Sequence, residues 1–307
     1  MPRASGLVPR AFRVPGAWLV LGASCAVTVL ASNTHAELKT AFAKQLEAMA
    51  AGVDGVVGYA VVDLTSGDRF ERHATASFPT ASTIKLAILY ELFKQADEGR
   101  VTLDDVKPLD KRHVVGGAGT LQQLTAPALS LRDHAILMIL QSDNTATNVV
   151  IGAVDMDAIT SRMAALGLGA TKLRRRMMDL DAARQGRENV SSPADIARLL
   201  AILDRGEGLS KASRDAAIDI LKRRKSTPLT RGLPPNVEAA SKPGDLDGVR
   251  VDAGIVYVPG RPYVFVMMGS WLADDTAGER AITDASRAAH RYFDRLASSN
   301  EAGRRVR

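Results

Sequence analysis

Ser82 and Lys85 stand three positions apart at the start of an apolar run, Leu86 to Leu92. If this run is a helix, both side chains lie on one face, and the Lys85 amine reaches the Ser82 hydroxyl. A hydroxyl is a poor nucleophile until a neighbouring base takes its proton, and an amine kept neutral by its surroundings is such a base. The pair indicates acyl transfer by a serine without a histidine. About one such pair arises by chance in a chain of this length, so the hypothesis depends on further residues.

Ser142, Asp143 and Asn144 directly follow an apolar helix predicted over 131–141. A hydroxyl both donates and accepts hydrogen bonds, so Ser142 is suited to relay a proton to a leaving nitrogen. The Asn144 amide is suited to hold a substrate amide. The same three residue types also commonly end helices, which is the simpler interpretation of this motif taken alone.

Lys242, Pro243 and Gly244 follow a strand predicted over 237–240. A lysine there would bind a substrate carboxylate, and a glycine permits close backbone approach. The backbone N–H groups of Ser82 and Asp245 would then form an oxyanion hole. The alternative is an ordinary connection from a strand to a turn.

The three motifs, in this order, resemble the S-x-x-K, S-D-N and K-T-G motifs of class A β-lactamases, a family of penicillin-recognising serine enzymes. The resemblance extends over about 38–296. It implies an acyl-enzyme mechanism in which a serine is acylated, a lysine activates it and a second serine delivers a proton to the lactam nitrogen. These catalytic residues would be Ser82, Lys85 and Ser142. The substrate-binding residues would be Asn144, Lys242, Gly244 and Asp245.

One departure from the family concerns the loop predicted over 173–189. The family carries a glutamate there that orients the water for hydrolysis of the acyl-enzyme. Alignment of this loop places Met177 at the glutamate position and Asp181 at the usual asparagine. A thioether cannot take a proton from water, so deacylation is slow or uses another base. The candidates in the loop are Asp179, Asp181 and Glu188.

A second departure is Pro243, which stands where the family has threonine or serine. It removes a hydroxyl that helps to hold a carboxylate, and it has no N–H. We therefore expect weakened or altered substrate recognition. Arg250 would compensate if its charge lies near Lys242, although a surface arginine on a strand is the simpler interpretation.

The order of predicted elements indicates an α/β (α+β) fold. Strands are expected near both ends of the chain, with helices between them. We expect an antiparallel sheet flanked by helices and built from both chain ends, with an inserted all-helical domain, as the resemblance also implies. The predicted α/β domain comprises 37–80 and 206–307, and the helical domain 81–205. The site would lie at their junction.

The first 36 residues have the pattern of a secretory signal peptide. They contain three arginines and no acidic residue, then an apolar stretch from Trp18 to Leu30 and a plausible cleavage site ending at Ala36. The alternative is an uncleaved anchor. Cys25, the only cysteine, lies in this segment, so a cleaved chain has no thiol. The prediction is a periplasmic or secreted protein.

The charge composition and the spacing of the histidines reduce the number of possible functions. Without residues 1–36 the chain has 37 basic and 34 acidic residues, which gives no argument for nucleic-acid binding. The five histidines show no metal-ligand spacing, so neither a metal nor another cofactor is expected. The predicted partner is a small β-lactam or cell-wall peptide, with no membrane contact after signal cleavage and a monomeric state. Three functions stay open: β-lactam hydrolysis, D-Ala-D-Ala carboxypeptidase or esterase activity, and an acyl trap or sensor without turnover.

Overall fold

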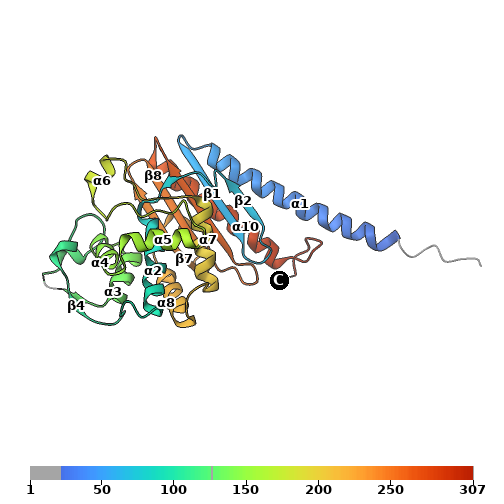
Figure 1. Ribbon diagram of the computed structural model, residues 1–307. Helices are drawn as coiled ribbons and strands as arrows, with labels where there is room; N and C mark the ends of the chain where they lie inside the picture. Colours follow the sequence, from blue (N-terminus) through green and yellow to red (C-terminus); the bar gives the residue numbers. More distant parts are fainter. Residues whose placement is uncertain (1–21, 126, 307) are drawn as a thin grey trace, which may run out of the picture.

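The computed structural model describes residues 22–125 and 127–306, with side chains from residue 34 onward. A five-stranded antiparallel sheet lies at the centre (Figure 1). Its strands, in spatial order, are β2 (Arg69–Arg72), β1 (Val56–Asp63), β9 (Tyr263–Ser270), β8 (Val249–Val256) and β7 (Ala239–Leu246). Because β1 pairs with β9 along its whole length, the two halves of the chain form one sheet, as predicted.

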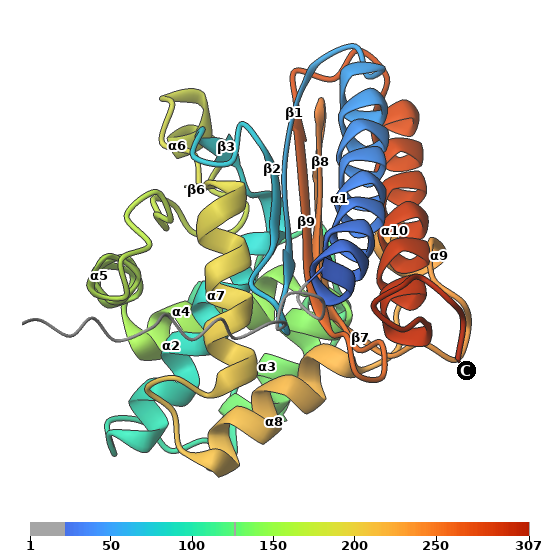
Figure 2. The ribbon, with the colours of Figure 1, turned by 90° about the vertical axis from the view of Figure 1, so that its right-hand side faces the viewer.

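Two long helices cover one face of the sheet, α1 (Gly22–Ala51) and α10 (Asp275–Ser298) (Figure 2). An aromatic cluster fastens them to the strands. Phe42 of α1 stacks on Tyr292 of α10 with ring centroids 4.3 Å apart, and Phe293 stacks on Tyr263 of β9 at 4.1 Å. Stacked and edge-on ring pairs of this kind add stability beyond the apolar area that they bury.

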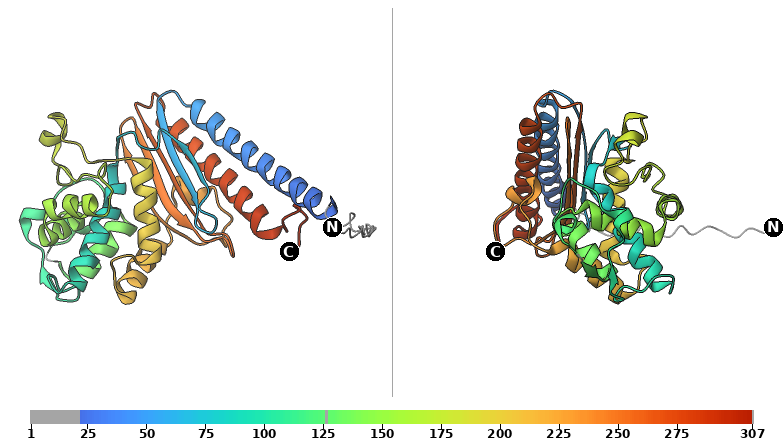
Figure 3. Two further views of the ribbon diagram at one scale, coloured as in Figure 1. Left: turned by 45° about the vertical axis from the view of Figure 1, so that its right-hand side comes forward. Right: turned by 90° about the vertical axis from the view of Figure 1, so that its left-hand side faces the viewer.

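The opposite face carries α7 (Pro193–Arg205), which packs on β1, β8 and β9, and beyond it α2 (Lys85–Asp97) and α8 (Lys211–Lys222) (Figure 3). Helix α2 is the centre of this half. Ten of its thirteen residues are buried, which explains why its sequence is apolar on all sides. The predicted domain boundaries at 80/81 and 205/206 remain predictions.

Three further helices contact α2. They are α3 (Leu131–Leu140), α4 (Asn144–Val154) and α5 (Met156–Ala165). The short helix α6 (Leu180–Arg184) lies within the loop predicted over 173–189, and α9 (Pro228–Arg231) packs against α10. Short 3₁₀ turns lie at Ala81–Ile84 (η1), Lys111–His113 (η2) and Leu121–Gln123 (η3). Two-residue strands pair β3 (Phe78–Pro79) with β6 (Val190–Ser191), and β4 (Lys107–Pro108) with β5 (Ala128–Leu129). Ser130 caps α3 as predicted, in a reciprocal capping box with Asp133.

The strand expected over 237–240 was placed too early. Lys242, Pro243 and Gly244 lie inside β7, not after it. A proline lacks the N–H for a ladder bond and is therefore rare inside a sheet. At the edge of a sheet one side of the strand has no neighbouring strand, so a proline is tolerated there, and β7 is the edge strand.

The predicted signal peptide lies partly outside the described residues, which begin at Gly22. From there a single helix continues through the predicted cleavage site to Ala51, and the Thr40 hydroxyl donates to the carbonyl of Ala36. Within 22–125 and 127–306, no helix has both the length and the hydropathy needed to span a membrane.

Candidate active site

Ser82 lies in η1, the single 3₁₀ turn that leads into α2, and Lys85 is the first residue of that helix. In a 3₁₀ turn the side chains at i and i+3 nearly eclipse, so the predicted proximity holds although the turn is tighter than an α-helix. Lys85 Nζ is 3.1 Å from Ser82 Oγ. The preceding residue, Ala81, has a positive φ of 45°, an uncommon conformation that is often found at functional sites.

Ser142 occupies the junction between α3 and α4, and it too has a left-handed backbone, with φ of 56°. Its hydroxyl donates to Ser82 Oγ at 2.8 Å and accepts from Lys85 Nζ at 3.0 Å. Lys242 Nζ reaches the same oxygen at 3.1 Å. The Ser142 hydroxyl is thus the centre that joins the nucleophile to both lysines.

Lys85 is fully buried and surrounded by neutral oxygens. Besides the two serine hydroxyls, its Nζ donates to the Ser142 carbonyl at 2.6 Å and to Asn144 Oδ1 at 3.2 Å. Burial lowers the pKa of Lys85 well below its ordinary value, and the nearby charge of Lys242 lowers it further. A lysine whose pKa is lowered in this way gives up its own proton more readily and can then accept that of Ser82.

Lys242 is delivered by strand β7, which passes against the nucleophile's own turn. A Cβ on Gly244 would lie 2.7 Å from the Thr80 carbonyl oxygen and 2.9 Å from Ser82 N, so any larger residue would push the strand away. Thr83 Oγ1 also donates to the Lys242 carbonyl at 3.3 Å. This close approach brings Gly244 beside the Ser82 N–H, and Asp245, predicted to supply the second N–H of an oxyanion hole, is the next residue of β7.

Charged groups behind β7 tune Lys242. Burial lowers the pKa of Lys242 to about 7; the charge of Asp252 raises it, and that of Lys225 lowers it further. Asp252 lies on β8 opposite Pro243 and accepts from the Leu229 N–H at 2.8 Å. Its own pKa is raised to about 6 by burial. Near neutral pH, Lys242 is therefore close to losing its charge.

The glycine-rich segment 116–119 lies against Asn144. The Gly116 carbonyl accepts from Asn144 Nδ2 at 3.2 Å. Gly117 has φ of 83°, and a Cβ there would meet both Asn144 Nδ2 at 2.7 Å and Met178 Sδ at 3.0 Å. The Asn144 amide is thus bonded both to this segment and to Lys85, and its role in holding a substrate amide stays a prediction.

Met177 is buried, and α4 fixes its position. Asn148 Oδ1 accepts from the Met177 N–H at 2.9 Å, and Asn148 Nδ2 donates to the Met177 carbonyl at 3.2 Å. Sequence reasoning missed Asn148. The available signal was its position four residues after Asn144 on one helix, which places both on the same face.

The three candidate acids of the loop are engaged elsewhere. Asp179 is exposed and caps α6 through the Ala182 N–H at 2.9 Å. Asp181 is exposed and pairs with Arg184, while Glu188 pairs with Arg175 at 2.7 Å. Within the described residues none of the three bonds to Ser82, Lys85 or Met177. Asp179 and Asp181 therefore stay predictions without a supporting contact.

Arg250 does not supply the charge considered near Lys242. Its guanidinium pairs with two acids of α10, Asp275 at 3.1 Å and Glu279 at 3.3 Å. It also donates to the Leu246 carbonyl at 2.7 Å. The arginine is therefore a part-buried link between β8 and α10, not a free surface residue.

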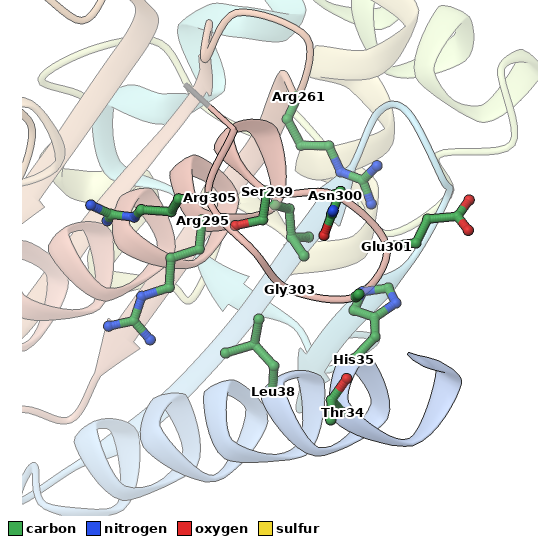
Figure 4. Close-up of a pocket in the computed structure, with 12 residues that line it drawn as sticks. Thr34, His35, Leu38, Arg261, Arg295, Ser299, Asn300, Glu301, Gly303 and Arg305 are labelled. Carbon is green, nitrogen blue, oxygen red and sulfur yellow. The ribbon is translucent and has the colours of Figure 1, made fainter. Parts of the chain in front are cut away.

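A cavity of about 800 Å³ lies away from these residues, between the N-terminal part of α1 and the C-terminal tail (Figure 4). None of its lining residues belongs to the group around Ser82. Thr34 and His35 form part of its wall, so cleavage after Ala36 would remove that part. Within the part of the chain that the structure describes, no cluster of histidine, cysteine and acidic residues is suited to a metal ion.

Comparison with known proteins finds relatives in the family that the motifs around Ser82 indicate. A family model described as the β-lactamase enzyme family matches residues 41–293. β-Lactamase CARB-3 of Pseudomonas aeruginosa is 25% identical over 173 residues, a stretch that covers 56% of this chain and only 60% of that protein. A solved β-lactamase from Sphaerobacter thermophilus DSM 20745 is 31% identical, with a TM-score of 0.73 over 81% of this chain and 94% of that one.

A second kind of relative is a protein called PBP-A. Its structure is 32% identical, with a TM-score of 0.77 over 83% of this chain and 96% of that one. A mutant of PBP-A with the same identity and TM-score is described as an acyl-enzyme complex with penicillin G.

Proposed function

Because the chain belongs to the β-lactamase enzyme family, we propose that it is a serine hydrolase in which Ser82 opens a β-lactam amide and releases the acyl group slowly. The observation that carries the proposal is the network around the nucleophile. Ser82 Oγ is 3.1 Å from a fully buried lysine and 2.8 Å from the Ser142 hydroxyl, whereas the loop presents buried Met177 where a glutamate would activate water.

The hydrogen bonds around Ser82 support the following steps of acylation. Neutral Lys85 takes the Ser82 proton as Oγ attacks the lactam carbonyl, and the Ser82 and Asp245 N–H groups stabilise the oxyanion. Ser142 gives its proton to the departing nitrogen and regains one from the lysines bonded to it. Lys242, when protonated, attracts a substrate carboxylate. Asn144 holds Lys85 and the substrate amide on opposite sides of its own amide group.

Deacylation is the weak step. Hydrolysis of the ester at Ser82 requires a base beside the attacking water, and a thioether has no suitable acid–base chemistry. Asn148 holds Met177 at this position through two backbone hydrogen bonds, so the loop does not bring Asp179 or Asp181 into its place. We expect the acyl-enzyme to accumulate.

A second candidate is a D-Ala-D-Ala carboxypeptidase or esterase, or a penicillin-binding trap without turnover. The likeness to PBP-A and to its penicillin G acyl-enzyme favours it. The same acylation chemistry serves both candidates, and they differ in the natural acyl donor. Release of D-alanine from a cell-wall peptide distinguishes the peptidase.

Intact-protein mass spectrometry after addition of excess benzylpenicillin tests the proposal. An adduct on Ser82 that forms quickly and clears slowly with substrate loss supports it. An adduct that never clears favours the trap or the peptidase. Absence of any adduct, from benzylpenicillin and nitrocefin alike, would show that the proposed acylation is wrong.

We further propose that the protein acts outside the cytoplasm, as a monomer, on a small-molecule substrate. The N-terminal sequence pattern and the exported targets of penicillin chemistry support this location. Fractionation of cells, with N-terminal sequencing of the mature protein, tests both export and cleavage after Ala36.

A further inference from the structure

Asp245 carries a carboxylate at the rim of the site for which the acylation chemistry has no use. The residue is exposed and lies directly after Gly244 on β7. Its side chain makes no hydrogen bond or ion pair within residues 22–125 and 127–306. Its charge nevertheless acts on both site lysines, because it raises the pKa of Lys85 and of Lys242 against the larger effect of burial.

Among the residues that the structure describes, no lysine or arginine forms an ion pair with Asp245. Its cross-strand partner on β8 is Arg250, the residue best placed to form a pair. The Arg250 guanidinium is instead bonded to Asp275 and Glu279 of α10. Lys242, the lysine on the same strand, has a pKa lowered by burial to about 7, so its positive charge diminishes as the pH rises above neutral.

The position of Asp245 relative to a bound acyl donor follows from β7. Gly244 lies against Ser82 N, and in the proposed acylation the next N–H along the strand, that of Asp245, is the second donor to the substrate carbonyl oxygen. The Asp245 side chain branches from the Cα atom next to the N–H that would bind the substrate carbonyl oxygen. A charged group next to the scissile bond would therefore lie within several ångströms of the Asp245 carboxylate.

We propose that Asp245 is a specificity residue that disfavours acyl donors with a carboxylate beside the scissile bond and favours neutral esters and amides. The inference rests on the proposed acylation of Ser82. Like charges repel, and the missing hydroxyl at Pro243 removes one group that would otherwise bind a carboxylate. Asp245 thus opposes the attraction that protonated Lys242 exerts on the same carboxylate, and acyl donors without a charge beside the scissile bond are favoured.

The test compares benzylpenicillin with its neutral methyl ester. Second-order acylation rates are measured by intact-protein mass spectrometry at pH 8 for the full chain, for Asp245→Asn and for Asp247→Asn. Asp247 is an exposed acid in the adjacent β7–β8 turn, so its substitution removes the same charge from a different place. The ratio of the benzylpenicillin rate to the ester rate cancels the intrinsic reactivity of each compound.

In Asp245→Asn we expect this ratio to rise about tenfold, the size expected for two unit charges roughly 7 Å apart in a partly solvated site. In Asp247→Asn it should stay within about twofold, because an exposed charge farther away is screened. An unchanged ratio in Asp245→Asn, with adducts still forming, overturns the inference and leaves the proposed function intact. If Asp245→Asn does not fold, Asp245→Ser serves in its place. Absence of adducts in every protein would instead refute the proposed function.

Discussion

The group around Ser82 and the loop over 173–189 differ in how completely they are built. Around Ser82, two lysines and two serines from η1, α2, β7 and the α3–α4 junction share one hydrogen-bond network. The loop is also well ordered, but it presents a buried thioether, and its acids cap a helix or pair with arginines. The groups proposed for acylation and the loop proposed for hydrolysis lie on different elements. One step can therefore be changed without the other.

The largest expected effect comes from Ser82→Ala, which removes the only proposed nucleophile. Adduct formation with benzylpenicillin should fall by roughly 10⁵-fold or more, to the level of nonspecific reaction. Mass spectrometry of the intact protein measures it. Ser66→Ala, at an exposed turn, is the control and should acylate normally. An adduct of normal rate in Ser82→Ala would place the chemistry elsewhere.

Lys85→Met tests whether the lysine is the base for acylation. The substitution keeps an unbranched side chain of similar size and removes the amine, so the acylation rate should fall about 10²- to 10⁴-fold. Stopped-flow measurement with nitrocefin gives the rate, and thermal unfolding confirms that the variant is folded. A fall of less than tenfold would mean that another group takes the Ser82 proton.

Met177→Glu should give the loop over 173–189 the base for deacylation that it lacks. A carboxylate at this position, held by Asn148 as Met177 is, would activate water and raise the deacylation rate by about 10²-fold or more. The decay of the isolated acyl-enzyme measures this rate. Met178→Glu adds the same charge one residue away and should change it little. Equal decay in wild type and Met177→Glu would show that the loop does not serve the site.

The smallest effect concerns the charge of Lys242. Lys242 donates to Ser142 when protonated, so acylation should decline as pH rises through its pKa of about 7. The charge of Asp252 raises this pKa, and Asp252→Asn should therefore move the decline to lower pH and reduce the rate at pH 7.5 by about twofold.

Lys225→Met provides a control of opposite sign. The charge of Lys225 lowers the pKa of Lys242, so its removal should move the decline to higher pH. Rate–pH profiles of both variants are compared with that of wild type. Shifts in the same direction would contradict the electrostatic explanation.

Much of the architecture was determined locally by the sequence. The apolar run after Lys85, the strand patterns near both chain ends and the Ser130 cap depend on neighbouring residues, and the helix after Lys85, the antiparallel sheet and the capped helix followed as predicted. The short helix α6, inside the loop predicted over 173–189, was not predicted. The approach of Lys85 to Ser82 was also predictable, because it spans one turn. Local patterns misplaced the strand at Lys242, since Pro243 is tolerated only because β7 has no outer neighbour, which is a property of the whole sheet.

Tertiary structure alone decided the electrostatics of the site. The sequence motifs identified Lys85 and Lys242 as site residues. Their pKa values are lowered because they are buried beneath η1, β7 and the α3–α4 junction. Likewise, the family resemblance predicts that Met177 stands in place of an acid, and only the fold showed that Asn148 fixes it and that Arg250 is bonded to α10 and does not pair with Asp245. The reason is physical: hydrogen bonds within a turn depend on adjacent residues, whereas desolvation and charge pairing depend on atoms brought together from distant parts of the chain.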